Sequence, residues 1–153
     1  MAFDTPNGTR GARQPGRSRL EQRGNRWMVD RIRRKGVRGD KQVVLVTIGK
    51  RTGEVRMNPV RCFPEPDGTK LIVASAAGAP RNPAWYYNIA AHPDRVRIDY
   101  AGRQIPVVPE QLHGAEREAA WKRVTAAAPG FARYERITDR EIPVIRLTPR
   151  DAG

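Results

Sequence analysis

Short apolar runs, separated by turn residues, fill the chain from about Lys41 onward. Gln42–Ile48 is β-branched and apolar almost throughout, which is typical of a buried strand. Arg95–Tyr100 alternates apolar with charged residues, which is typical of a strand buried on one face. The pattern predicts six strands, at Gln42–Ile48, Glu54–Phe63, Thr69–Ser75, Arg95–Tyr100, Arg103–Val108 and Pro143–Leu147.

Helical spacing is confined to segments that do not alternate regularly with these strands. We expect helices at 21–35, Pro83–Ala91 and Gly114–Ala128, with one or two further turns at 131–137. Such an order argues against a doubly wound parallel sheet. It favours an α+β domain built on an antiparallel barrel with flanking helices.

The first 20 residues contain only two large apolar residues, Phe3 and Leu20. Because such a stretch buries too little apolar surface to offset its ordering entropy, we expect disorder there. The predicted organisation is a disordered basic leader at 1–20, an amphipathic N-terminal helix at 21–38 and a barrel domain at 39–150.

The chain of 153 residues carries a net charge of +13, and most of it lies near the N-terminus. Residues 1–41 hold 12 basic and 4 acidic side chains, so the remainder has only +5. With no alternation of basic and aromatic strand residues, we expect no specific nucleic-acid partner, although a basic nucleic-acid-binding module is one alternative. A second alternative is contact with an anionic membrane through Trp27, Met28 and Ile32; otherwise this helix is a solvated cap.

Cellular location is constrained by three features of the sequence. The single Cys62 excludes an internal disulfide. No apolar run approaches the roughly 20 residues that span a bilayer. The first residues lack the apolar core of a signal peptide, so we expect a cytoplasmic protein, with membrane association as the alternative.

The densest cluster of candidate chemistry lies between the first two predicted strands. Gly49 and Gly53 bound a turn that presents Lys50, Arg51 and Arg56. Glycine lets a ligand approach the backbone closely, and guanidinium groups with backbone N–H groups suit phosphate oxygens. The turn is therefore either a phosphate site or a polar hairpin with solvated charges.

Two later segments are candidates for the walls of a site. Small residues follow the third strand and lead to Asn82, which we expect to cap the next helix, and to Trp85, either a core aromatic or a pocket wall. The segment Phe131–Arg140 either closes over a ligand or is a surface connector. His92 and His113 have no partner at metal-ligand spacing, and no catalytic triad is evident, which favours chemistry supplied by a cofactor.

These segments, taken in order, resemble the deazaflavin-dependent nitroreductase family of actinobacteria. The matching motifs are Gly-Lys-Arg-Thr-Gly-x-x-Arg-x-Asn-Pro, Ala-Ser with small residues, Asn-Pro-x-Trp-Tyr-x-Asn and Thr-Asp-Arg-x-Ile-Pro-Val. The resemblance covers about residues 27–149. It implies a split β-barrel and a reductase that passes hydride from reduced coenzyme F-420, a polyanionic deazaflavin, to a quinone, an activated double bond or a nitro compound.

The resemblance also implies the residues of the site. Turn cations would hold the phosphate and tail, the small residues would lie beside the ring, and Tyr134 would act near the substrate as the catalytic residue. The implied cofactor-binding residues are Lys50, Arg51, Thr52, Arg56, Met57, Asn58, Pro59, Ala74, Ser75, Ala76, Ala77, Asn82 and Trp85. No metal is expected.

Departures from the family pattern concern the acceptor side. Ala76 stands where a related enzyme has a serine, and Arg61 and Phe131 stand where it has tyrosines. These changes do not alter the cofactor that the resemblance implies, but they leave the identity of the acceptor undetermined. Two functional alternatives remain: an FMN-dependent oxidoreductase of the same barrel, and a protein that only stores the coenzyme. For the assembly, a homodimer is one alternative.

Overall fold

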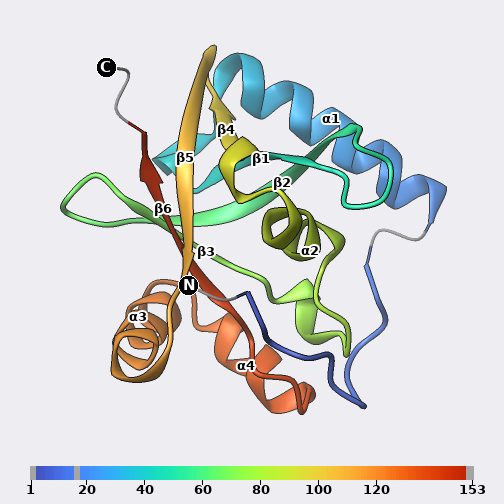
Figure 1. Cartoon of the computed structure of the whole chain (residues 1–153), viewed down its shortest axis with the longest axis vertical. Helices are drawn as coiled ribbons and strands as arrows, with labels where there is room; N and C mark the ends of the chain where they lie inside the picture. Colours follow the sequence, from blue (N-terminus) through green and yellow to red (C-terminus); the bar gives the residue numbers. More distant parts are fainter. Residues whose placement is uncertain (1–2, 16–17, 151–153) are drawn as a thin grey trace.

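The computed structural model describes residues 3–15 and 18–150 (Figure 1). Six strands pair antiparallel and close into a barrel in the order β1-β2-β3-β6-β5-β4. Their bounds are β1 Gln42–Ile48, β2 Val55–Pro64, β3 Lys70–Val73, β4 Arg97–Tyr100, β5 Arg103–Gln111 and β6 Val144–Pro149. The expected α+β barrel of six strands is confirmed.

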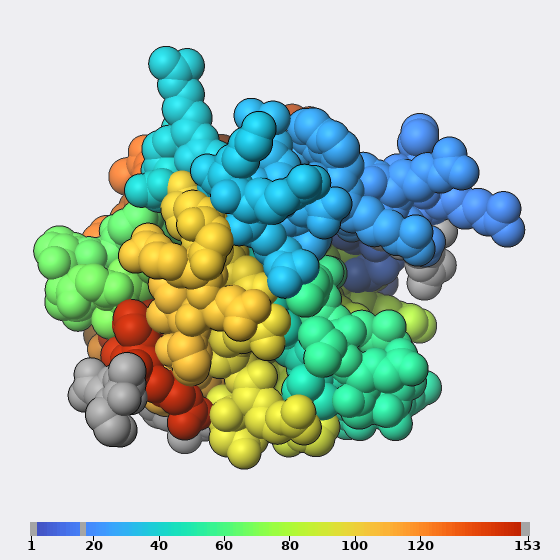
Figure 2. Space-filling view, turned by 90° about the horizontal axis from the view of Figure 1, so that it is seen from above, coloured from blue at the N-terminus to red at the C-terminus, as the bar shows by residue number. Residues whose placement is uncertain are grey.

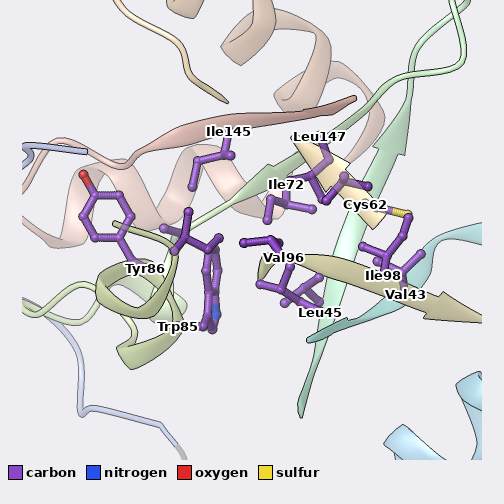
Figure 3. Close-up of a cluster of buried hydrophobic side chains, with 14 residues drawn as sticks. Val43, Leu45, Cys62, Ile72, Trp85, Tyr86, Val96, Ile98, Ile145 and Leu147 are labelled. Atoms are coloured by element: carbon purple, nitrogen blue, oxygen red, sulfur yellow. The ribbon is translucent and has the colours of Figure 1, made fainter. Parts of the chain in front are cut away.

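Strand β1 is apolar along nearly its whole length because both of its faces are buried. Val43 and Leu45 point into the barrel core, together with Trp85 from outside the sheet (Figure 3). Val44 and Val46 face the opposite way and pack beneath the first helix. A strand covered on both sides has no solvent face to alternate with, so its apolar run is continuous.

In the described part of the chain, four helices surround the barrel, namely α1 Arg19–Lys35, α2 Ala84–Ala91, α3 Gly114–Ala127 and α4 Gly130–Ile137. α1 lies on one side of the barrel, and α3 and α4 lie on the other (Figure 1). Helix α2 contributes Trp85, Tyr86 and Ile89 to the barrel core. The described residues also include three short 3₁₀ turns: η1 Arg38–Asp40, η2 Ala76–Gly78 and η3 Pro93–Arg95.

The apolar side of α1 packs on the barrel and does not face outward. The Ser18 hydroxyl accepts a hydrogen bond from the Glu21 N–H and begins the helix. Ile32 is fully buried and Met28 packs against the same cluster. Trp27, Met28 and Ile32, the three residues of the membrane alternative, therefore do not share an exposed face, and of these three only Trp27 is exposed, at 61%.

Residues 3–15 also differ from the expected disorder. The segment runs past α2 and α4 in Figure 1. The Thr5 N–H donates to the Tyr86 hydroxyl, the Gly8 N–H donates to the Pro80 carbonyl, and the Thr9 N–H donates to Asp139. Polar contacts with the folded body hold it, which an argument based on apolar burial alone overlooks. We call residues 3–15 the strap.

Candidate functional site

The β1–β2 turn forms a compact, projecting lobe on the surface (Figure 2). The Gly49 N–H donates to the Glu54 carbonyl at 2.7 Å, and the Gly53 N–H donates to the Gly49 carbonyl at 2.9 Å. Gly53 has a φ of 71°, a conformation that glycine adopts without strain. Lys50 and Arg51 are exposed on this turn, and no carboxylate among the described residues pairs with either.

The turn is fixed from below by helix α2. The Asn88 Oδ1 accepts from the Lys50 N–H at 3.0 Å, while its Nδ2 donates to the Thr47 hydroxyl at 3.2 Å. Asn88 is 8% exposed. The Lys50 ammonium lies 5.9 Å from the centre of the Tyr87 ring, within cation–π range. Sequence reasoning did not assign Asn88 or Tyr87 to the site, although both lie in a motif of the family resemblance.

Among the described residues, Arg56 is the cation of this turn that pairs with a carboxylate. Its Nη2 lies 3.4 Å from the Thr52 hydroxyl and 3.4 Å from the Glu54 carboxylate. Because its side chain is 49% exposed, this ion pair is weak and screened by solvent. An anionic ligand can therefore compete with Glu54 for the guanidinium.

Strand pleating divides the expected residues of β2 between two faces. Asn58 is directly opposite Leu45, whose side chain lies in the barrel core. Met57 is opposite Val46 and packs with it in the cluster under α1. Pro59, two residues from Met57, shares that outer face. Asn58 on one face and Met57 and Pro59 on the other are all half-buried. Because the two faces are opposite, a ligand on one face cannot contact all three side chains.

The small-residue loop after β3 is shaped by a buried arginine that sequence reasoning did not single out as a site residue. Ala76 and Ala77 have φ values of 45° and 54°, unusual for residues other than glycine. Arg140, 4% exposed, donates to the carbonyls of Ala74 at 2.9 Å and Ser75 at 2.7 Å. A guanidinium offers five donors in a rigid plane, which suits this clamp.

Asn82 has a different role from the one expected. It does not cap α2, because the N-cap is Pro83 and no side chain bonds the helix terminus. Its Oδ1 accepts from Arg140, and its Nδ2 donates to the Thr5 carbonyl and the Tyr87 hydroxyl. Asn82 is 3% exposed, so it organises the loop instead of presenting its amide to a ligand.

Two aromatic candidates lie in separate clusters. Trp85 is 7% exposed and belongs to the barrel core. Tyr134, on α4, is half-buried, and its ring makes an edge contact with Phe131 at 5.4 Å between centroids. Among the described residues, no group hydrogen-bonds the Tyr134 hydroxyl. Its backbone lies against η2, because a Cβ built on Gly78 would be 3.4 Å from the Tyr134 Cα.

Tyr87 joins the two parts of the site. Its ring lies under the Lys50 ammonium, and its hydroxyl accepts from Asn82 at 3.3 Å. The turn cations and the small-residue loop are thus neighbours through one side chain of α2. The site therefore combines an anion-binding turn with a loop of small residues whose position is fixed by buried hydrogen bonds.

Other classes of site receive no support from the part of the chain that is described. No group of three or more His, Cys, Asp or Glu residues could hold a metal ion within 3–15 and 18–150. Over those ranges, no helix is long and apolar enough to cross a membrane. Burial raises the pKa of the Cys62 thiol to about 11, so Cys62 is not a nucleophile near neutral pH.

Comparison with known proteins identifies relatives across most of the chain. The F420H(2)-dependent quinone reductase Rv1261c of Mycobacterium tuberculosis is 35% identical over 111 residues, 71% of this chain and 73% of that protein. A solved F420-H2 dependent reductase, FDR-A, is 35% identical with a TM-score of 0.62, covering 70% of this chain and 93% of that one.

A second solved structure, described as a domain-swapped dimer, is 30% identical with a TM-score of 0.65, covering 84% of this chain and 96% of that one. The model of the F420H(2)-dependent quinone reductase family matches residues 20–149. That match spans the turn, the small-residue loop and α4, and the family uses reduced coenzyme F-420. The chain belongs to the F420H(2)-dependent quinone reductase family.

Proposed function

We propose that this protein binds reduced coenzyme F-420 at the β1–β2 turn and the small-residue loop, and reduces a quinone-type acceptor. Family membership supports the reaction class. The observation that carries the proposal for this chain is the pair of exposed cations, Lys50 and Arg51, on a turn that Asn88 fixes. Cations without a carboxylate partner on a rigid turn suit a polyanion.

The residues present fit the parts of the coenzyme. Lys50, Arg51, Thr52 and Arg56 would hold the phosphate and the acidic tail. The loop from Ala74 to Ala77 has no bulky side chain, so a flat ring can lie against its backbone. On β2, Asn58 lies on one face and Met57 and Pro59 lie on the other, so the coenzyme would contact only one of these two sets.

When bound, the coenzyme supplies a hydride, and together with one proton this reduces a quinone to its hydroquinone. The protein's task is then to orient the ring and exclude water. Tyr134 could hydrogen-bond the acceptor oxygen, because no described residue occupies its hydroxyl. Because a tyrosine hydroxyl both donates and accepts hydrogen bonds, Tyr134 can position the acceptor oxygen.

The alternatives are less well supported. FMN also has a phosphate that the turn could bind, but the family uses the deazaflavin coenzyme. A nucleic-acid-binding module is not favoured either, because the described residues include no strand face that alternates basic with aromatic side chains. A storage role remains distinguishable by experiment, because a storage protein would bind the coenzyme without oxidising it.

The test is anaerobic rapid mixing of the protein, reduced coenzyme F-420 and a naphthoquinone. We expect one hydroquinone for each coenzyme oxidised, and no comparable rate with reduced FMN. Binding without oxidation by any quinone would favour storage, and turnover with reduced FMN alone would favour the flavin alternative.

A peripheral membrane contact through α1 is a second, narrower proposal. Leu20 and Trp27 are 79% and 61% exposed on a helix with six arginines. Arginine near an anionic surface contributes about 1 kcal/mol per residue. Wild type should sediment with anionic vesicles more than Trp27→Ala, and equal sedimentation would remove the idea. Dimer formation stays a prediction.

A further inference from the structure

A cavity lies on the outer face of β2 and β3, away from the β1–β2 turn. It has a volume of about 310 Å³. Phe63 and Leu71 are apolar residues of its lining, Lys41 and Arg61 lie on the β1–β2 side, and Arg123 of α3 closes the opposite side. An apolar lining with a few polar groups is the usual composition of a small-molecule site.

Arg61 has unused hydrogen-bonding capacity in this cavity. Its Nε atom is buried and has no hydrogen-bond partner among the described residues. Its guanidinium carbon lies 5.0 Å from the centre of the Phe63 ring. Buried donors are nearly always paired in folded proteins, so this N–H calls for an acceptor supplied from outside the chain.

The charge of the cavity is positive because its one acid is already neutralised. Glu65 accepts hydrogen bonds from Arg146 at 2.9 Å and from Arg123 at 3.0 Å. Burial alone would raise the pKa of Glu65, but the hydrogen bonds from Arg146 and Thr69 outweigh it, and the pKa is lowered. Lys41 and Arg61 have no carboxylate partner among the described residues, so the cavity attracts anions.

A row of aromatic rings connects this cavity to the small-residue loop. The Phe63 ring contacts the Phe131 ring at 5.7 Å between centroids, and Phe131 contacts Tyr134 at 5.4 Å. The Tyr134 backbone in turn lies against Gly78 of η2. The row therefore runs from Arg61 toward the loop where the coenzyme ring is proposed to lie.

We propose that this cavity is the outer end of the acceptor site, and that Arg61 selects flat aromatic acceptors carrying an anionic group. The inference rests on the proposed function, because it names the class of acceptor for that reaction. The acceptor's ring would lie against the half-buried Phe131 and Tyr134 side chains, with its anionic group bound by the Arg61 guanidinium and attracted by Lys41. Arg61 is a specificity-determining residue in this account.

The test compares two probes with the same ring system and a substituent of similar size, one anionic and one neutral: anthraquinone sulfonate and its sulfonamide. Calorimetric titration of the coenzyme-free protein measures binding without turnover. We expect wild type to bind the sulfonate about tenfold or more tightly than the sulfonamide, as a charge-assisted hydrogen bond would give. This preference should shrink as salt is added, since the cavity is open to solvent.

Three variants sharpen the test. Arg61→Gln should lose the preference for the sulfonate while its affinity for the sulfonamide is retained. Arg61→Lys should keep part of the preference, because it keeps the charge but not the planar donors. The control is Arg103→Gln, at an exposed arginine that begins β5, which should bind both probes like wild type.

Equal affinity of wild type for the two probes would overturn the proposal. So would an unchanged preference in Arg61→Gln, or displacement of the sulfonate by an equal concentration of inorganic phosphate, which would indicate a simple anion site. Failure of the proposed function is a separate result. If no quinone oxidises the reduced coenzyme yet the sulfonate preference depends on Arg61, the site stands as a ligand site and the reaction is wrong.

Discussion

Arg140 donates a hydrogen bond from Nη1 to the Asn82 Oδ1 at 2.6 Å, although 58 residues separate them along the chain. The same guanidinium donates to the Ala74, Ser75 and Ala79 carbonyls. One buried cation thus fixes the whole loop that leads from β3 to α2. The family's Thr-Asp-Arg motif near the C-terminus has a structural reason here, because its arginine shapes the loop proposed to receive the coenzyme ring.

Replacing Arg140 should therefore destabilise the protein strongly. Arg140→Gln leaves several buried carbonyls without donors, and we expect a loss of about 3–5 kcal/mol in the free energy of unfolding. Arg140→Lys should not restore the stability, because one ammonium group cannot donate to all the acceptors that the guanidinium reaches. Denaturant unfolding measures the loss, with the exposed Arg133→Gln as control. A loss below about 1 kcal/mol, the range of an ordinary surface change, would contradict the clamp.

Asp139 should hold the strap in a pH-dependent way. Its pKa is lowered to about 2, chiefly because the Thr9 hydroxyl donates to it, with the Arg10 and Thr9 N–H groups adding to the effect. Since the folded pKa lies below the ordinary value of about 3.9, the contact is fully formed above that pH and is lost as pH falls toward 2. The amide resonances of Thr9 and Arg10 should titrate with a midpoint near 2.

A variant tests the same contact at neutral pH. Asp139→Asn removes the charged acceptor, so trypsin should cut after Arg10 and Arg13 faster than in wild type. Asp94→Asn, at an exposed aspartate of η3, is the matched control and should be cut at the wild-type rate. Equal rates in all three proteins would mean that Asp139 does not hold the strap.

Cys62 should be unreactive in the folded protein. It is 1% exposed, and burial raises the pKa of its thiol to about 11, an effect only partly offset by Lys70 and Arg61. Because the thiolate is the nucleophile, alkylation with iodoacetamide near neutral pH should be slow until the protein is unfolded. Rapid labelling of the native protein at that pH would show that the thiol is neither buried nor protonated as described.

Asn88 should act on coenzyme binding by positioning the turn. Asn88→Ala removes the acceptor for the Lys50 N–H and the donor to Thr47, while leaving every turn cation in place. We expect a stability loss of about 1–2 kcal/mol and weaker coenzyme binding at unchanged charge. The exposed Asn25→Ala on α1 is the control. Wild-type affinity in Asn88→Ala would show that the turn needs no support from α2.

The sequence predicts the barrel well because its strands carry strong local signals. The strand predicted at Gln42–Ile48 has those bounds in the structure. The turn predicted between Gly49 and Gly53 is also present, closed by a hydrogen bond from the Gly53 N–H to the Gly49 carbonyl. Helix bounds are close, with α1 beginning at Arg19 because Ser18 caps it. Strand β5 runs on to Gln111, three residues past the predicted end, because those residues pair with β6.

Contacts between distant segments are what the sequence does not reveal. The residues next to Asn82 in the sequence predict that it caps a helix. Its side chain instead hydrogen-bonds Arg140 and Thr5, which are far away along the chain. Residues 3–15 look disordered because the groups that bind them, among them Tyr86 and Asp139, lie far away along the chain. The apolar face of α1 is visible in the sequence, but not that β1 and β2 cover it.

The central claim is that cations of the β1–β2 turn bind coenzyme F-420, and equilibrium titration of the protein with the oxidised coenzyme tests it most directly. Arg51→Ala and Arg56→Ala should each weaken binding by about 1.5–3 kcal/mol, with the larger loss in Arg51→Ala because Glu54 already compensates part of the Arg56 charge. Both variants should unfold like wild type, and Arg103→Ala should bind the coenzyme normally. If both turn variants bind it as tightly as wild type, the coenzyme does not bind at this turn.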